Sequence, residues 1–388
     1  PDFVVSEVID HELNNEKNLL RQIEGEMLVP SFLENEEINA RLKMDSLGKP
    51  VYRGLQKFYF QVSIPRCAET ATDPLPVLVF GHGLFRSPRQ ELLTDYHKML
   101  HNRLCMVEVS THWIGLSEPD VLPITQYVMA DFSNFCQITD RLQQSLVNMH
   151  TLVQLMKGSF LQNEAMKING KPVTDGKSMY YLGISNGGNM GVAFAALTND
   201  IERFVFNVSG GWWSQMMERS SNFIVYAELL KTFYKDPLDR ALMIMMSQHL
   251  WDYTDPIVFA PNVLQSPLSG RKKKKLLFQE SKHDDQVPNV ATRTIVRALG
   301  LTALLPVVES VYGVEEEEEG PLESAYAQWD TKPPIQPPGD NTPAPKPSDD
   351  VSAHKVLRTL ESCIQQIEQF LTPTGKIVNT CGGVCGKE

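Results

Sequence analysis

The chain has 388 residues, of which 42% are hydrophobic and 21% charged, a balance typical of a globular protein that buries a sizeable core. Its formal net charge of -11 argues against a general attraction to nucleic acid or anionic lipid. No apolar run approaches the roughly 20 residues needed to span a bilayer, because the best one, 298–308, is interrupted by Gly300 and Pro306. We therefore expect no transmembrane segment and no nucleic-acid partner.

The beginning of the chain, PDFVV, has no initiator Met. We expect from this a mature or trimmed form whose targeting segment has been removed. Residues 1–56 have an acidic, helix-like start followed by turn residues between short apolar runs. They predict an N-terminal extension with a short helix and short strands.

Strand-like and helix-like segments alternate from residue 57 onward. Strands are predicted at 57–65, 75–83, 104–110 and 203–209, and helices at 88–102 and 131–156. Such alternation is typical of βαβ crossovers and predicts an α/β fold with a mostly parallel central sheet flanked by helices. We assign residues 57–210 to the first part of this core.

Residues 211–270 depart from the alternation, because they are helical in pattern, rich in Met and Trp, and contain no obvious strand. We interpret them as a helical cap, or lid, inserted into the core. An apolar cap would suit an acyl or aromatic substrate. The alternative is that the Met and aromatic side chains simply form core.

The second part of the core is predicted at 271–388. It contains a strand at 274–281, a helix at 289–300, a strand at 324–330, a proline-rich connecting loop at 331–350 and an amphipathic C-terminal helix at 351–371. Two charge runs, RKKKK at 271–275 and EEEEE at 315–319, are expected to be solvated turns.

A candidate nucleophile lies in the stretch YLGISNGGNMG, residues 181–191, which fits G-x-S-x-G with Gly183, Ser185 and Gly187 in the fixed places. A strand-like run precedes it and a helix-like run follows. A sharp strand-to-helix turn pushes a serine hydroxyl out over the sheet edge. Ser185 is therefore the predicted nucleophile, and the alternative is a small residue in a tight turn.

The serine needs a base to take its proton, and the base needs an orienting carboxylate. In a doubly wound hydrolase the order along the chain is Ser, acid, His, each at the carboxyl end of a strand. Asp284 follows the predicted strand at 274–281 and is the favoured acid, with Asp285 as the neighbouring alternative or as a helix cap.

His354 follows the last predicted strand and begins the C-terminal helix, which is where the base belongs in this order. The alternative base is His283. It shares a loop with Asp284, so it could act only if Asp252 or Asp255 were the acid.

Two backbone N–H groups must stabilise the oxyanion. Asn186 follows the nucleophile at a helix N-terminus, whose dipole adds positive potential. The second donor is predicted to be Leu84, in the stretch FGHGLF at 80–85, where Gly83 permits close approach. His82 is interpreted either as a supporting residue of this loop or as a structural histidine in a plain glycine turn.

Cys381 and Cys385 lie four residues apart in a glycine-rich tail with no further His or Cys beside them to complete a metal site. A small disulfide loop is the favoured interpretation, and two idle thiols are the alternative. A disulfide would indicate an oxidising compartment. The predicted chemistry requires no metal and no organic cofactor.

Taken together, FGHGLF, GISNGGNMG, HDDQVPN and AHKVLR resemble the α/β-hydrolase superfamily of serine hydrolases. Further stretches, among them EGEMLVPSFL, THWIGLSEPD and GKIVNTCGGVC, resemble a branch of secreted bacterial-type hydrolases, over about residues 25–385. The resemblance implies the α/β-hydrolase fold, the triad Ser185, Asp284 and His354, and a disulfide in the C-terminal tail. The two charge runs depart from the pattern, as does Glu280, where a small residue is expected.

These observations predict a secreted or exported hydrolase that cleaves a small-molecule or lipid-like carboxylic ester through an acyl-enzyme. An amidase, peptidase or acyltransferase would use the same triad. A non-catalytic binding module on the same fold is the third alternative, because a fold alone does not establish activity.

Overall fold

The computed structural model describes residues 1–317 and 320–386, so the last residues of the EEEEE run lie outside the described part. The chain divides into two compact units. The first unit comprises Pro1–Val121 and Cys136–Leu182, and the second comprises Leu122–Phe135 and Gly183–Glu388. No helix in the described ranges combines the length and apolar character needed to cross a membrane.

The first unit contains the strand order β1-β2-β3-β5-β4-β8. β1 pairs with β2, β2 with β3, and β3 with β5, all in antiparallel, whereas β5 pairs with β4 in parallel. The strands span β1 (Phe3–Asp10), β2 (Leu19–Ser31), β3 (Gly54–Pro65), β4 (Val77–Gly81), β5 (Val107–Thr111) and β8 (Met179–Ile184). The expected helix at the start of the chain is wrong. Val4, Val5 and Val8 favour extended backbone, and β1 pairs along β2 from Phe3 to Asp10.

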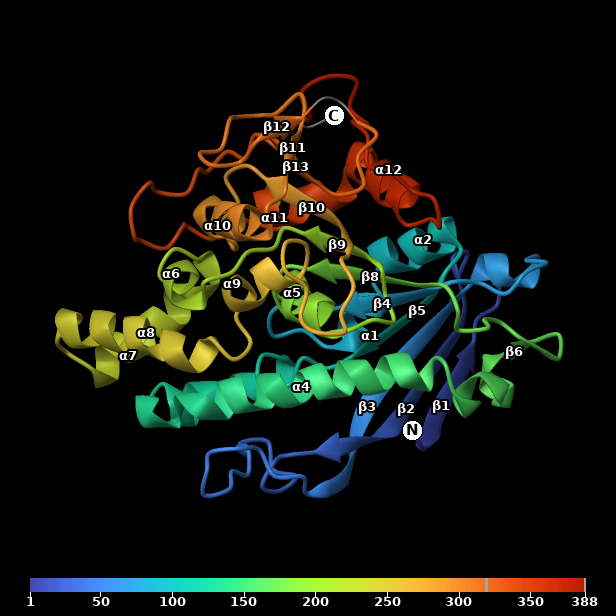
Figure 1. Cartoon of the computed structure of the whole chain (residues 1–388), viewed down its shortest axis with the longest axis horizontal. Helices are drawn as coiled ribbons and strands as arrows, with labels where there is room; N and C mark the ends of the chain where they lie inside the picture. Colours follow the sequence, from blue (N-terminus) through green and yellow to red (C-terminus); the bar gives the residue numbers. More distant parts are fainter. Residues whose placement is uncertain (318–319, 387–388) are drawn as a thin grey trace. The chain divides into compact units, whose positions relative to one another are not determined.

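Three helices of the first unit are α1 (Pro88–Leu92), α2 (Asp95–Leu104) and α4 (Cys136–Leu155). The predicted helix at 88–102 is interrupted, because Thr94 ends the first turn and its side chain caps α2 at the His97 N–H. Helix α4 packs against β2 and β5, and Figure 1 shows it running beside the long strands. A disulfide joins Cys67 to Cys105, the left-handed residue that ends α2.

The second unit contains five parallel strands in the order β9-β10-β13-β11-β12. They span β9 (Arg203–Asn207), β10 (Lys275–Ser281), β11 (Ala303–Leu304), β12 (Glu316–Glu317) and β13 (Ala325–Trp329). Helices α5 (Asn186–Leu197), α10 (Asn289–Leu299) and α12 (Glu361–Phe370) pack against β9 or β10. The predicted helix at 351–371 is divided, since α11 (Ala353–Val356) is separated from α12 by a tighter turn. The expected architecture, a mixed and mostly parallel sheet flanked by helices, is confirmed.

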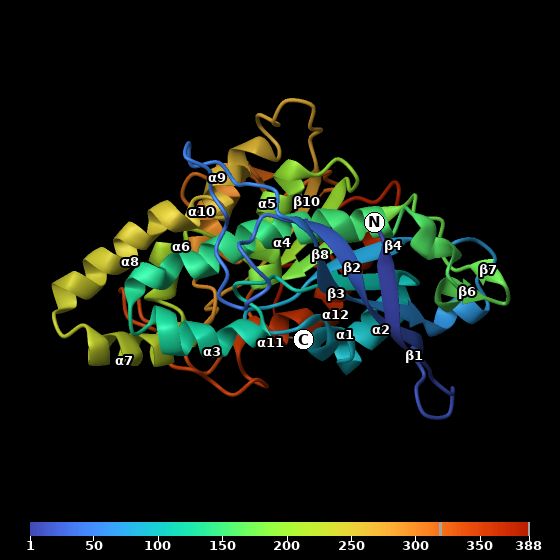
Figure 2. The same cartoon turned by 90° about the horizontal axis from the view of Figure 1, so that it is seen from below.

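A helical insert, defined as residues 212–262, interrupts the second unit between β9 and β10. It contains α6 (Trp213–Met217), α7 (Ile224–Phe233), α8 (Pro237–Trp251) and α9 (Pro256–Phe259), and its described residues include no strand. Helices α7 and α8 form a helical hairpin (Figure 1), which is also visible in the turned view of Figure 2.

Aromatic stacking stabilises the insert. The rings of Trp213 and Trp251 stack with their centroids 4.8 Å apart. The edge of Phe135, from the segment 122–135, meets Trp251 at 5.1 Å. The N–H of Phe132 donates to the Tyr234 hydroxyl at 2.8 Å. The segment 122–135 therefore packs with the insert, a partner that the sequence pattern did not indicate.

Candidate active site

Ser185 occupies a strained turn between β8 and α5. Its φ of 58° and ψ of -123° lie outside the regions that ordinary side chains favour, and such strain is concentrated at functional sites. A side chain at Gly183 would overlap the backbone of Gly187, and one at Gly188 would overlap the Ser209 side chain. Close packing around the serine thus explains Gly183 of the predicted motif and also Gly188, which lies outside it.

Neighbouring strands fix the position of Ser185 in the second unit. Its N–H donates to the carbonyl of Asn207, the last residue of β9, at 2.9 Å. The next residue of that segment, Val208, donates to Gln279 of β10 at 2.9 Å. Ser185 and the loop that follows β10 therefore leave the carboxyl ends of strands that are separated by β9.

Asp284 lies in the loop after β10 and is buried, with 2% of its surface exposed. Its Oδ1 accepts the backbone N–H groups of Gln286 at 2.8 Å and Val287 at 2.9 Å. These bonds fix the carboxylate in one orientation. The preceding residue, His283, has a φ of 62°, so the loop turns sharply immediately before the acid.

His354 meets this carboxylate. Its Nδ1 lies 2.8 Å from Asp284 Oδ2 and 3.0 Å from Oδ1, and the ring is buried. An ionised carboxylate only accepts hydrogen bonds, so the shared proton is placed on Nδ1 and the Nε2 lone pair is left available. That tautomer is the one a general base requires. The structure therefore brings the predicted acid and base together.

Ser185 and His354 both belong to the second unit, and Ser185 is 6% exposed. Within residues 1–317 and 320–386, no hydrogen bond joins Ser185 Oγ to His354 Nε2. In serine hydrolases, the hydrogen bond between nucleophile and base is commonly long without substrate and tightens only when substrate binds.

The alternative acids have other partners. Asp255 accepts the backbone N–H groups of Trp212 at 2.8 Å and Trp213 at 2.7 Å, which places it at the start of α6. Asp252 accepts from the Gln248 side chain at 2.8 Å. Desolvation by burial raises the pKa of Asp255. These carboxylates hold the helical insert in shape.

His283, the alternative base, is placed by a backbone contact. Its N–H donates to Asn289 Oδ1 at 2.7 Å. Burial lowers the pKa of its imidazole, and the neighbouring Lys282 lowers it further. Of the two candidate bases, His354 is the one that contacts the Asp284 carboxylate.

The two predicted oxyanion donors lie in different units. Asn186 is the first residue of α5 in the second unit, and Leu84 lies in the loop after β4 in the first. His82 fixes the Leu84 loop, because its Nδ1 lies 2.8 Å from the Gly83 carbonyl and its Nε2 accepts the Trp113 N–H at 2.9 Å. Burial lowers the pKa of His82. The neutral ring therefore bridges two loops.

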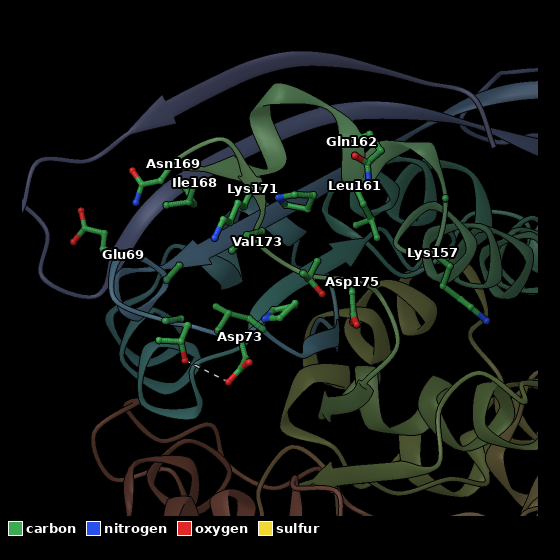
Figure 3. A pocket seen from close by; sticks show the side chains of 18 residues that line it. Glu69, Asp73, Lys157, Leu161, Gln162, Ile168, Asn169, Lys171, Val173 and Asp175 are labelled. Atoms are coloured by element: carbon green, nitrogen blue, oxygen red, sulfur yellow. Dashed lines mark hydrogen bonds between the residues drawn. The ribbon is translucent and has the colours of Figure 1, made fainter.

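A groove of about 660 Å³ lies elsewhere, in the first unit (Figure 3). It is found just before β4 and β8, at the amino ends of these strands, and is lined by both charge signs, including Asp73, Lys157 and Asp175. None of the site residues predicted from the sequence lines it. The described residues contain no group of three or more His, Cys, Asp or Glu arranged to hold a metal ion.

Two disulfides are present, Cys381–Cys385 and Cys67–Cys105. The first matches the disulfide favoured from the sequence. The second was missed, because 38 residues separate its cysteines and no local pattern connects them. Cys136 and Cys363 are buried and belong to neither disulfide.

Comparisons with known proteins were made by sequence and by structure. No protein-family model matches the chain, and the search of curated protein sequences found no match.

Solved structures are similar to this chain at low identity. Acetyl xylan esterase 1 from Thermoanaerobacterium sp. JW/SL YS485 matches with a TM-score of 0.43 and 13% identity, over 79% of this chain and 83% of that one. The acylaminoacyl peptidase of Pyrococcus horikoshii matches with a TM-score of 0.46 and 13% identity, over 88% of this chain and 42% of that one. An S-formylglutathione hydrolase from Agrobacterium tumefaciens matches with a TM-score of 0.37 and 12% identity, over 79% of this chain and 87% of that one.

Proposed function

We propose that the chain is a serine hydrolase of the α/β-hydrolase type that cleaves carboxylic esters, with Ser185, Asp284 and His354 as its triad. The observation that carries this proposal is the 2.8 Å contact between His354 Nδ1 and Asp284 Oδ2, in the same unit as a serine held at a strained strand-to-helix turn. The same contact leaves His354 Nε2 with the lone pair that a base needs.

In the proposed reaction Ser185 Oγ attacks the acyl carbon while its proton passes to His354 Nε2. Asp284 holds the imidazole and stabilises the imidazolium that forms. The carbon–oxygen bond to the alcohol then breaks, and His354 returns the proton to the leaving oxygen. Water attacks the acyl-enzyme by the same proton route and releases the acid. The N–H group of Asn186, the residue after the nucleophile, is a proposed oxyanion donor.

The helical insert supports a substrate with an apolar acyl group. Its exposed side chains include Leu238, Leu242, Met245, Met246 and Tyr253, which are apolar or aromatic. Flexible Met and Leu side chains adapt to varied apolar ligands. The two disulfides support export to an oxidising compartment.

Labelling with a fluorophosphonate and hydrolysis of p-nitrophenyl esters of graded chain length test the proposal. Ser185→Ala should abolish labelling and lower kcat by about 10⁴-fold or more, as loss of a catalytic serine does. Ser145→Ala, which alters a buried serine of α4, is the control and should keep both activities. Activity retained in pure Ser185→Ala would refute the triad. Cleavage of an anilide but no ester would replace the esterase with an amidase.

A further inference from the structure

Asp285, the neighbour of the proposed acid, is the centre of a buried hydrogen-bond network. Its Oδ1 accepts the Ser352 hydroxyl at 2.6 Å, and its Oδ2 accepts the Ser221 hydroxyl at 3.0 Å. All three side chains are buried, with exposed fractions of 1–3%. A buried carboxylate is stable only when its oxygens are bonded, so both contacts matter for its placement.

The contact with Ser352 bears on His354. Ser352 is the residue before α11, and its carbonyl accepts the N–H groups of Lys355 at 3.0 Å and Val356 at 2.9 Å. The position of Ser352 therefore sets where this short helix begins, and His354 is its second residue. Asp284 holds the imidazole ring of His354, and Asp285 holds the backbone that carries it.

The contact with Ser221 bears on the helical insert. Besides its hydroxyl, the Ser221 N–H donates to the carbonyl of Asp285 at 2.8 Å. Asn222 donates from its side chain to Gln286 Oε1 at 3.2 Å. Ser221 begins the turn that leads directly into α7. The loop that carries Asp284 and Asp285 therefore binds the insert at the residues that lead into α7.

The proline-rich loop, residues 331–350, also contacts the residues that precede α7. Arg219 accepts the Ala344 N–H at its backbone carbonyl at 3.1 Å. The Arg219 guanidinium donates a hydrogen bond to Asn341 Oδ1. The residues that precede His354 and those that precede α7 are therefore joined twice, once directly and once through Asp285.

We propose that Asp285 is a positioning residue that places the base through Ser352 and fixes the helical insert, to which acyl binding is proposed above, through Ser221. This inference rests on the proposed function and deepens it. It assigns separate tasks to the two oxygens of one carboxylate: Oδ1 serves turnover, and Oδ2 serves substrate binding.

The contributions of the two Asp285 oxygens are tested separately by removing one serine hydroxyl at a time. Ser352→Ala should lower kcat about tenfold, the scale expected for a sub-ångström misplacement of a catalytic group, and leave KM nearly unchanged. Ser221→Ala should raise KM several-fold and keep kcat within about twofold. Asp285→Ala should show both effects. Asp285→Asn, whose amide still bonds a hydroxyl on each side, should restore most of the activity.

Rates are measured per Ser185 labelled by fluorophosphonate, and melting temperatures are recorded beside them, so that loss of folded protein is not read as loss of turnover. Ser145→Ala is the matched control, since its hydroxyl is buried and donates to the Leu142 carbonyl at 2.7 Å within α4, outside the insert. A fall in melting temperature with unchanged kcat and KM in both serine variants would overturn the assignment. So would an equal effect of Ser145→Ala on turnover.

A second readout does not depend on activity. The proton that His354 Nδ1 shares with Asp284 gives a downfield NMR resonance, which should shift in Ser352→Ala and Asp285→Ala and return in Asp285→Asn. If wild-type protein hydrolyses no ester and Ser185 is not labelled, the proposed function fails, and this resonance alone decides the positioning role. A resonance unmoved in both variants would overturn that role whatever the activity.

Discussion

His82 Nε2 accepts a hydrogen bond from the Trp113 backbone N–H at 2.9 Å, while Nδ1 of the same ring lies 2.8 Å from the Gly83 carbonyl. One neutral imidazole thus satisfies a donor and an acceptor on two loops of the first unit. Nε2 cannot take a proton and keep this bond, which agrees with the lowering of the His82 pKa by burial.

His82→Ala should therefore destabilise the first unit. It leaves the buried Trp113 N–H without its partner, at a cost of about 1–3 kcal/mol, whereas the Gly83 carbonyl still accepts the Arg86 N–H at 3.2 Å. Urea unfolding monitored by Trp fluorescence measures the loss. His249→Ala, at an exposed position of α8, is the control and should leave stability within about 0.5 kcal/mol. Equal stability of His82→Ala and wild type would remove the bridging role.

Gly188→Ala tests the packing behind the nucleophile. Gly188 lies in α5, where alanine ordinarily stabilises a helix by about 1 kcal/mol. A methyl group here would overlap the Ser209 side chain, so we expect a net destabilisation of about 1–3 kcal/mol. Fluorophosphonate labelling should also slow, because the turn that carries Ser185 begins this helix.

Gly383→Ala provides the comparison for that variant, because a side chain there would meet nothing within 4 Å. It should change neither stability nor labelling. Labelling of Gly188→Ala at the wild-type rate with unchanged stability would show that the turn tolerates a larger neighbour.

The two disulfides should differ in their contribution to stability. The separation of 38 residues between Cys67 and Cys105 predicts an entropic stabilisation of about 4 kcal/mol. The separation of 4 between Cys381 and Cys385 predicts about 2 kcal/mol. Guanidinium unfolding of Cys67→Ala/Cys105→Ala and of Cys381→Ala/Cys385→Ala compares them. A larger loss in the tail variant would contradict the loop-length argument.

The sequence predicted those features that depend on local pattern and chain order. Strand–helix alternation gave the parallel core, and the strand-to-helix context of Gly183, Ser185 and Gly187 gave the turn that the structure shows. Order along the chain favoured Asp284 and His354, the resemblance implied that they act together, and the structure shows their contact across 70 residues of sequence.

Other features depend on contacts that no local pattern encodes. The Asp285 network joins three segments that lie far apart in the chain. From the sequence, Asp285 is therefore interpreted only as an alternative acid or as a helix cap. Glu280, which stands where the resemblance leads us to expect a small residue, also depends on such a contact. Its Oε1 pairs with Arg293 of α10 at 2.9 Å, and this distant guanidinium compensates a buried charge.

His101 should limit stability in acid. Desolvation lowers the pKa of this buried imidazole to about 4, against 6.5 for the exposed group. The unfolded chain therefore binds the proton more tightly than the folded protein, so His101 contributes stability above pH 6.5 that is lost as the pH falls toward 4. The gap between these two pKa values corresponds to about 3 kcal/mol.

Replacing His101 by leucine removes this titration and should flatten the dependence of unfolding free energy on pH between about 6.5 and 4. Urea unfolding at a series of pH values measures the slope, with His249→Leu as the control at an exposed site. The sign follows from burial, since the charged imidazolium is the form that the interior penalises. A slope in His101→Leu as steep as in wild type would assign the acid sensitivity to other groups, of which the half-buried His112, whose pKa desolvation lowers to about 3, is the next to test.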